Sequence, residues 1–401
     1  MKRNSVPNDR PPVRRIINIE LPEGRLGLRL ALVIGLIALA VASFALGINS
    51  LVSTDAGLTE ITALSGEMNA GGRFTFYYYL GYGGADAGDE KRELRGVYTE
   101  AATDALGLFC AGVETTGAGG LYWLSRRPNE ELHVDAALYS ALEQLEASGT
   151  RYHYLAPLYE QYHALCSSVG DEEAAQYDPR LDAAQAEYYA ECAAFASDGA
   201  AVDLELLGDG KVRLRVSDEY LAFARENGIS CFVDLGWMEN AFIADYLAGT
   251  LEAAGFTRGA LISEDGFMRC LDTETGSEYA FDFTHREGGE VTVLSTLRFA
   301  GRVSIACLRD YPAEGSGGEG YYMYEDGTLR SPFLDVSDGL DSCAAPELCG
   351  WSEDAGCAAI ALELAPIFIA DALNVEALEA LENEGITVYY AEDGALRSTA
   401  A

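Results

Sequence analysis

An uncharged apolar run near the N-terminus most constrains how this chain can fold. Residues 30–48 read LALVIGLIALAVASFALGI and contain no charged side chain. At a rise of about 1.5 Å per residue, a helix of this length nearly crosses a hydrocarbon core of about 30 Å. No polar face interrupts the run, which disfavours the alternative of a core helix. We therefore expect one transmembrane helix over 30–48.

The charged residues are distributed unevenly on the two sides of this run. Residues 1–29 contain seven basic and three acidic side chains. The whole chain has 64 acidic and 27 basic residues and a formal net charge of −37, so the acidic excess lies entirely after residue 29. Because basic segments stay on the cytoplasmic side, we expect a cytoplasmic N-terminus and a large extracytoplasmic domain.

A cleaved signal peptide is the main alternative to a membrane anchor. The leader of 29 residues is long for a signal peptide, and the cleavage-like motif Ala40-Val41-Ala42 lies inside the apolar run. An uncleaved anchor is therefore predicted. The expected organisation is a basic cytoplasmic tail (1–29), a transmembrane helix in the lipid bilayer (30–48), a stalk (49–70) and an extracytoplasmic domain (71–401).

The composition excludes two classes of protein. A strong negative charge is incompatible with binding the phosphate backbone of nucleic acids. A hydrophobic content of 49% and an aromatic content of 10% supply a core, which a disordered acidic tail lacks. The nine cysteines are an odd number, so at least one is unpaired. Scattered buried thiols are the favoured interpretation, and a short disulfide loop between Cys343 and Cys349 is the alternative.

Strand and helix patterns alternate through the external domain. Apolar and polar residues alternate over 202–206 and 212–216 on either side of a Gly-Asp-Gly turn, which predicts a hairpin. Leu138, Leu142 and Leu145 form one face of a helix that Asp135 caps. The other expected elements are a strand over 74–82, helices over 97–110, 183–196, 241–254 and 375–384, a hairpin that pairs 279–283 with 291–297, and a hairpin that turns at 326–327. This mixture predicts an α+β fold.

The most informative segment reads VDLGWMENAFIAD over 233–245. A strand that ends at Asp234 leads through Gly236 into a helix, whose first N–H groups can face an anion. The segment resembles the D-L-G-G-I-A-K-G-Y-A-A-D signature of the ApbE family, the FAD:protein FMN transferases. Residues 260–266 are similar to the family's strand and Gly-Gly turn, 334–339 to its H-I-I-D-P-x-T-G motif, and 354–358 to its A-D-x-x-x-T metal motif. The resemblance covers about 70–400 in sequence order.

This resemblance implies an ApbE-like, T-fold-type external domain that binds FAD and a divalent cation such as Mg²⁺. Proteins of the family use the cation to polarise the FAD pyrophosphate, and they transfer FMN to a threonine hydroxyl of a target protein. At the matching positions, the implied flavin-site residues are Asp234, Gly236, Asn240, Asp335 and Gly339, and the implied metal ligands are Asp338 and Asp354. No catalytic residue is predicted.

Five positions depart from the family's motifs. Asn240 replaces the family's lysine and Ala241 its next glycine, and Pro332 or Phe333 stands where its histidine would be. Asp338 replaces the threonine before Gly339, and Ala358 replaces the metal-binding threonine. The four histidines of the chain all lie away from these motifs in the sequence. Losing a lysine, a histidine and a metal ligand together is expected to remove most of the transition-state stabilisation.

Three functions remain open. The favoured hypothesis is a membrane-anchored protein that has lost FMN transfer and keeps a flavin or nucleotide pocket. The alternatives are an active FMN transferase with altered site residues, and a non-enzymatic module whose acidic surface binds cationic partners. Asp234 likewise has two interpretations, as a flavin-site residue or as a carboxylate that caps the following helix. Asp245 is expected to be structural or solvent-facing rather than a metal ligand.

Overall fold

A computed structural model describes residues 56–66, 68–114, 119–287, 289–312 and 320–400. The predicted cytoplasmic tail and transmembrane helix over 1–48 lie outside these residues. Within the described ranges, none of the helices combines the length and the apolar character that a bilayer crossing needs.

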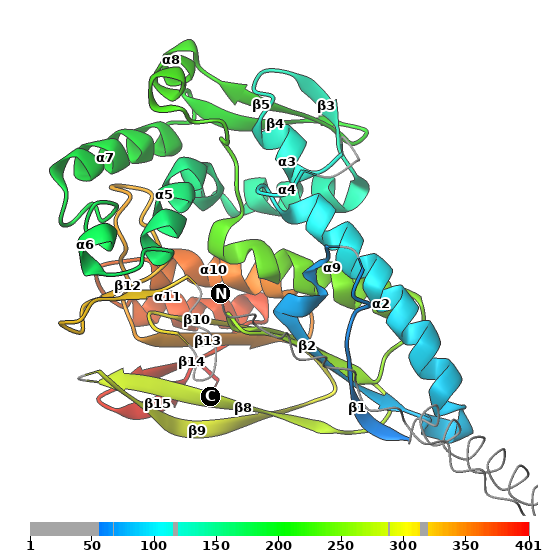
Figure 1. The fold of residues 1–401 in the computed structure, drawn as a ribbon. Coiled ribbons are helices and arrows are strands. Elements are labelled where there is room, and N and C mark those ends of the chain that lie inside the picture. The colour runs from blue at the N-terminus through cyan, green and yellow to red at the C-terminus, as the bar shows by residue number, and fades with distance from the viewer. Residues whose placement is uncertain (1–55, 67, 115–118, 288, 313–319, 401) are drawn as a thin grey trace, which may run out of the picture. The chain divides into compact units, whose positions relative to one another are not determined.

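The centre of the domain is an eight-stranded antiparallel sheet (Figure 1). In spatial order its strands are β1 (Gly57–Ile61), β2 (Phe74–Leu80), β6 (Gly259–Ser263), β7 (Phe267–Leu271), β10 (Arg302–Arg309), β13 (Glu347–Ser352), β14 (Thr387–Glu392) and β15 (Ala395–Ser398). Buried and half-buried residues alternate along β2, because successive side chains of a strand point to opposite faces.

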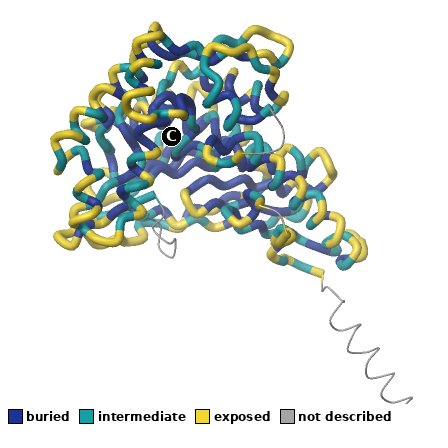
Figure 2. The backbone as a smooth tube through the Cα atoms, turned by 45° about the horizontal axis from the view of Figure 1, so that its top comes forward, coloured by how far each residue is buried: buried dark blue, intermediate teal, exposed yellow. Residues whose placement is uncertain are grey.

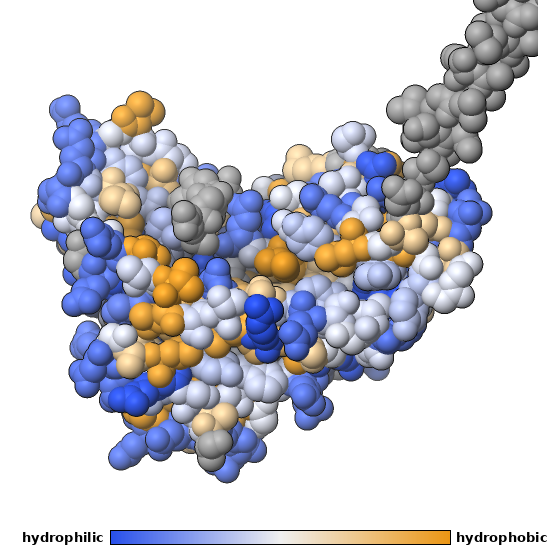
Figure 3. All heavy atoms as spheres, turned by 90° about the horizontal axis from the view of Figure 1, so that it is seen from below, coloured by the Kyte–Doolittle hydropathy of each residue, from blue (hydrophilic) through white to orange (hydrophobic). Residues whose placement is uncertain are grey.

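Three helices cover one face of this sheet, and a long hairpin covers the other (Figure 1). The helices are α2 (Ala87–Phe109), α9 (Glu239–Ala253) and α10 (Cys357–Phe368), and the hairpin pairs β8 (Glu278–Glu287) with β9 (Glu290–Ala300). Figure 2 shows the buried residues concentrated between these layers. The face seen from below in Figure 3 carries a band of apolar residues among hydrophilic ones, and Val291 and Val293 of β9 are exposed.

A second group of elements lies beyond the helical layer, at the top of Figure 1. It contains a three-stranded sheet of β3 (Glu131–His133), β5 (Lys211–Val216) and β4 (Val202–Gly208), with α3 (Leu121–Ser125), α4 (Ala136–Ser148), α5 (Ala156–Cys166), α6 (Asp171–Ala174), α7 (Ala183–Ser197) and α8 (Asp218–Asn227). The short strands β11 (Tyr322–Met323) and β12 (Leu329–Arg330), the helix α11 (Val375–Ala380) and the 3-10 turn η5 (Leu381–Glu384) complete the domain.

Most of the predicted elements are confirmed. The Asp135 carboxylate accepts from the N–H of Ala137 at 2.8 Å and begins α4, whose buried face includes the three predicted leucines. The predicted hairpins are β4–β5, β8–β9 and β11–β12. The predicted helices correspond to α7, α9 and α11 with η5, and α2 begins ten residues earlier than expected, at Ala87.

Three findings differ from the sequence-based expectations. The expected strand that ends at Asp234 is absent, since residues 229–235 form neither a strand nor a helix. Residues 57–61 belong to the predicted stalk, but they form β1 and pair with β2. The folded domain therefore includes Gly57. The helix α10 was not predicted, because its apolar residues leave no polar face and its sequence contains Pro366, although the helix continues through this proline. All nine cysteines are free, and seven of them are buried, so the interpretation as scattered thiols is confirmed and the alternative Cys343–Cys349 disulfide is not formed.

Candidate active site

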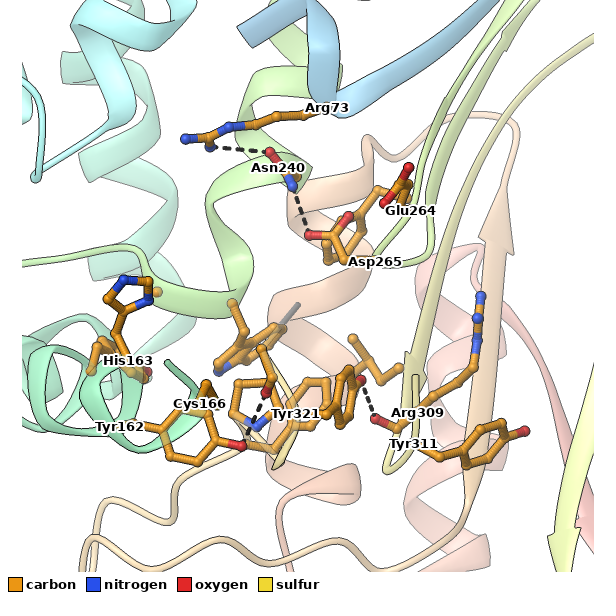
Figure 4. A pocket seen from close by; sticks show the side chains of 18 of the residues that line it. Arg73, Tyr162, His163, Cys166, Asn240, Glu264, Asp265, Arg309, Tyr311 and Tyr321 are labelled. Carbon is orange, nitrogen blue, oxygen red and sulfur yellow. Dashed lines mark hydrogen bonds between the residues drawn. The ribbon is translucent and has the colours of Figure 1, made fainter. Parts of the chain in front are cut away.

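A cavity of about 890 Å³ lies where the sheet, α5 and the start of α9 meet (Figure 4). Its wall comes from the 3-10 turn η1 (Ala70–Arg73), from α5, from the 3-10 turn η4 (Gly236–Met238) that precedes α9, from the β6–β7 turn, and from the segments around 308–311 and 320–333. This volume is in the range of small-molecule sites. The name cavity is kept here for the space that these segments enclose.

Aromatic side chains form much of the cavity wall. The rings of Trp237 and Phe333 lie 5.1 Å apart between centroids. The hydroxyl of Tyr162 donates to the carbonyl of Gly320 at 3.0 Å, and that of Tyr321 donates to the carbonyl of Arg309 at 2.9 Å. Because these hydroxyls are already bonded to backbone, the rings offer mainly apolar faces. Such a wall suits a flat, conjugated ligand.

A chain of side-chain contacts crosses one side of the cavity (Figure 4). The Arg73 guanidinium donates to the Asn240 amide oxygen at 3.4 Å, and the Asn240 amide nitrogen donates to the Asp265 carboxylate at 2.8 Å. Arg73 also forms an ion pair with Glu239 on the first turn of α9. The amide of Asn240 therefore bridges the cation of η1 and the anion of the β6–β7 turn.

The surrounding protein shifts the pKa of two of these carboxyl groups. Burial raises the pKa of Glu239 to about 7, although Arg73 opposes the shift. The protein atoms around the Asp265 carboxyl also raise its pKa, although this side chain is exposed and hydrogen bonds from Ser263 and Asn240 oppose the shift. Both shifts follow from the partial loss of water around a carboxylate. The carboxyl groups beside Arg73 are thus less acidic than fully hydrated ones.

The turn before α9 is fixed by backbone contacts. Gly236 has a φ of +54°, and a Cβ atom there would lie 2.5 Å from the Tyr159 ring, so this position requires glycine. The Asp234 carboxylate accepts from the Gly236 N–H at 2.9 Å, and the Asp234 N–H donates to the carbonyl of His153. Burial raises the pKa of Asp234. Asp234 thus holds the turn before η4, and its interpretation as the cap of the following helix is wrong, because neither η4 nor α9 has a side-chain cap.

The predicted flavin-site residues divide into two groups. Gly236 and Asn240 line the cavity, whereas Asp234, Asp335 and Gly339 are not among its lining residues. Asp335 accepts from the N–H of Ser337 at 2.7 Å and holds its own loop. Gly339 has a φ of +79°, and its backbone packs closely against Leu158. These three residues shape turns beside the cavity.

The predicted metal ligands are both at the surface. Asp338 is exposed and accepts from the Leu340 N–H at 2.9 Å, and Asp354 is exposed on the turn before α10. Among the described residues, no three or more His, Cys, Asp or Glu side chains are grouped so that they could hold a metal ion. The residues present therefore offer no ready Mg²⁺ site, and the assignment of Asp338 and Asp354 stays a prediction.

Asp245 has a structural role that links two helices. Its two carboxylate oxygens accept from the N–H groups of Cys357 and Ala358, each at 2.9 Å, and the Arg269 guanidinium donates to it at 2.5 Å. A Cβ atom on Gly356 would lie 2.4 Å from this carboxylate. The aspartate at the end of the 233–245 segment thus caps the N-terminus of α10.

Two functional candidates in the cavity wall escaped the sequence analysis. Arg73 precedes β2 and lies in no recognisable motif. His163 was set aside because it is far from the motifs in the sequence, but α5 places it in the cavity wall, where it is exposed (Figure 4). Only the tertiary arrangement brings these residues to the cavity.

Comparisons with solved structures identify what this arrangement is similar to. The ApbE protein of Thermotoga maritima superposes with a TM-score of 0.58 at 15% identity, covering 85% of this chain and 96% of that one. The flavin transferase ApbE of Vibrio cholerae gives 0.55 at 13% identity, covering 86% and 97%. No family model and no curated protein sequence matches the chain. At these identities the similarity establishes the fold.

Proposed function

We propose, from an ApbE-like fold whose cavity has aromatic walls, that this chain is a membrane-anchored, extracytoplasmic flavin-binding protein without FMN transferase activity. The observation that carries the proposal is the Asn240–Asp265 hydrogen bond inside the cavity. At the position of the lysine in the ApbE signature this chain has Asn240, whose neutral amide already donates to a carboxylate.

The aromatic wall supports flavin binding. Trp237, Tyr321 and Phe333 can contact a flat ring system, because all three line the cavity. FAD, when bound, supplies the FMN group for transfer in flavin transferases, and the residues here would bind and orient its ring.

The charged groups argue against transfer. Phosphoryl transfer needs cations that face the phosphates and a group that moves a proton. Pro332 and Phe333, which stand at the position of the family's histidine, both line the cavity and carry no titratable group. The N–H of Ala358, at the position of the metal-binding threonine, is bonded to Asp245. These replacements support loss of the transfer reaction.

An active transferase with altered residues is the second candidate. It is favoured by one observation, the imidazole of His163 in the cavity wall, which could move a proton. The two candidates differ in a measurable product. The full chain in detergent is incubated with FAD, Mg²⁺ and a threonine-containing acceptor protein, and the acceptor is weighed by mass spectrometry. We expect no FMN-sized adduct, and an adduct that His163→Ala abolishes would establish the second candidate.

Flavin binding itself is tested by calorimetry with the full chain in detergent micelles. Heat of binding with riboflavin, FMN or FAD supports the proposal. Specific ligands bind with dissociation constants well below about 1 mM. If none of the three flavins binds up to about that concentration, an acidic interaction module is favoured instead.

The membrane anchor is tested separately. The apolar run over 30–48 and the basic segment before it support the anchor. We expect the chain to remain in the membrane fraction after an alkaline wash and to leave it in detergent. We also expect protease added to intact cells to digest the large domain and spare an N-terminal tag. Release by the wash would contradict the anchor.

A further inference from the structure

We infer that the cavity prefers a flavin without phosphate groups, such as riboflavin, over FMN and FAD. This inference rests on the proposed function, because it takes flavin binding as given and names the class of flavin. It follows from where the charged side chains of the cavity wall point and from what already neutralises them.

Among the described residues, two arginines belong to the cavity wall, but the charge of Arg309 lies away from the cavity. Its Nε is 3.6 Å from the carboxylate of the buried Glu347, and its guanidinium carbon is 5.7 Å from the ring centroid of Phe281 on β8. In Figure 4 its side chain extends away from Tyr321. What Arg309 offers the cavity is its carbonyl oxygen, and the Tyr321 hydroxyl already donates to that oxygen.

The second arginine, Arg73, points its guanidinium toward the cavity, but its charge is balanced above about pH 7, where the Glu239 carboxyl is ionised. The guanidinium forms an ion pair with Glu239, whose side chain is only 13% exposed. It also donates to the amide oxygen of Asn240. A phosphate that approached Arg73 would have to displace the Glu239 carboxylate or accept its repulsion.

The opposite side of this contact chain is anionic. Asp265 and its neighbour Glu264 form the β6–β7 turn, and both line the cavity. Asn240 donates a hydrogen bond to Asp265, but its amide is neutral. The negative charge of the Asp265 carboxylate is therefore not balanced. Above about pH 7, where ionised Glu239 balances Arg73, these two carboxylates give the described part of the cavity wall a net negative charge.

This charge distribution separates flavins by their phosphates. An isoalloxazine ring and a ribityl chain are uncharged, so they meet no repulsion from Asp265 and Glu264. FMN adds one phosphate and FAD adds a diphosphate. The carboxylates of Asp265 and Glu264 repel each of these anionic groups, because a protein wall screens charge less than bulk water does. Between nearby unit charges this repulsion corresponds to roughly a tenfold loss of affinity for each phosphate group.

The test uses the full chain in detergent at pH 8, where the Glu239 carboxyl is ionised, and at low ionic strength. Riboflavin, FMN and FAD are titrated separately by isothermal calorimetry. We expect the tightest binding for riboflavin, with affinity lower by about tenfold for FMN and again for FAD. Higher salt should narrow these differences, because it screens charges. FAD that binds more tightly than riboflavin would overturn this inference and leave flavin binding intact, whereas a chain that binds none of the three overturns both.

Two variants locate the origin of the preference. Asp265→Asn keeps an oxygen that accepts from Asn240, and Glu264→Gln changes an exposed side chain, so both should fold. Each is expected to raise the affinity for FAD about tenfold and to change that for riboflavin by less than about twofold. Glu143→Gln, on an exposed position of α4 outside the cavity, is the matched control and should change neither. Equal gains for riboflavin and FAD in the cavity variants would refute the charge argument.

Discussion

Asn240 and Asp265 are joined by a 2.8 Å hydrogen bond between their side chains, which links the first turn of α9 to the β6–β7 turn. The bond holds a neutral donor against a carboxylate at the edge of the cavity. We therefore expect the charge at position 240 to affect the affinity of the cavity for anionic ligands.

Asn240→Lys should make the cavity more tolerant of phosphate. The ammonium group would pair with Asp265 and cancel one of the two unbalanced carboxylates, so FAD affinity should rise by about fivefold to tenfold while riboflavin affinity stays within about twofold. Calorimetric titration measures both. Asn227→Lys, which adds the same charge at the exposed end of α8, serves as the control. An equal gain in the control would assign the effect to the overall charge of the protein.

The pH dependence of stability should carry a contribution from Glu239. Its pKa is about 7 in the folded chain and ordinarily 4.5, so the folded state holds a proton that the unfolded state releases between these values. The stability that Glu239 contributes is therefore present below about pH 4.5 and is lost as the pH rises through 7. Urea unfolding of the wild type at pH 5 and pH 8 should show a decrease larger by about 1–3 kcal/mol than in Glu239→Gln. Parallel curves for the two proteins would contradict the raised pKa.

Removing the cap of α10 should destabilise the domain strongly. Asp245→Ala leaves two helix N–H groups without an acceptor and the nearly buried Arg269 without its ion pair, at a cost of about 3–5 kcal/mol. Asp245→Asn keeps one acceptor oxygen and should cost less. Glu252→Ala, which removes a more exposed ion pair with Arg302 from the same helix, should cost at most about 1 kcal/mol. Urea unfolding gives all three values, and similar losses for Asp245→Ala and Glu252→Ala would disprove the capping role.

Glycine substitutions should have opposite effects at two positions. Gly236→Ala places a methyl group against the Tyr159 ring at a positive φ, and we expect a loss of about 2 kcal/mol or more. Gly96→Ala, inside α2 with open space around it, should gain about 0.5–1 kcal/mol from helix propensity. Thermal unfolding distinguishes the two. A neutral Gly236→Ala variant would mean that the η4 turn adapts.

Alkylation of Cys166 reports on occupancy of the cavity. Burial raises the pKa of this thiol to about 11, so we expect slow reaction with an uncharged maleimide near neutral pH. Saturating riboflavin should slow it further, by several fold. Cys343 is also half-buried but is not a lining residue, so its rate is the internal control. Peptide mass mapping resolves the two sites, and equal protection of both would indicate a global change instead of a ligand in the cavity.

Elements with a local pattern could be predicted from the sequence. The cap and leucine face of α4 and the Gly-Asp-Gly hairpin of β4–β5 are fixed by residues within one short segment. The helix α10 could not be predicted, because it is surrounded by apolar contacts and its cap, Asp245, comes from more than 100 residues earlier in the chain.

The candidate site was predictable only where a motif marks it. Gly236 and Asn240 were found because the 233–245 segment resembles a known signature, and both line the cavity. Arg73 and His163 reach the same cavity from η1 and α5, and no spacing in the sequence relates them to the motif. Contacts between distant segments decide which side chains share a site. Motifs and spacings within one sequence do not reveal which distant segments are in contact.

The position of β1 has a mechanical consequence. This strand has five residues, lies at the edge of the central sheet, and is the first described strand after the apolar run. Its antiparallel register pairs Gly57 with Leu80 and Ile61 with Phe76, so tension applied at the N-terminal side would peel β1 from β2 one residue pair at a time. Such peeling breaks few bonds at once and leaves the β2–β6 pairing intact. If the proposed membrane anchor is present, force transmitted through it should therefore detach this strand well before it disturbs the cavity.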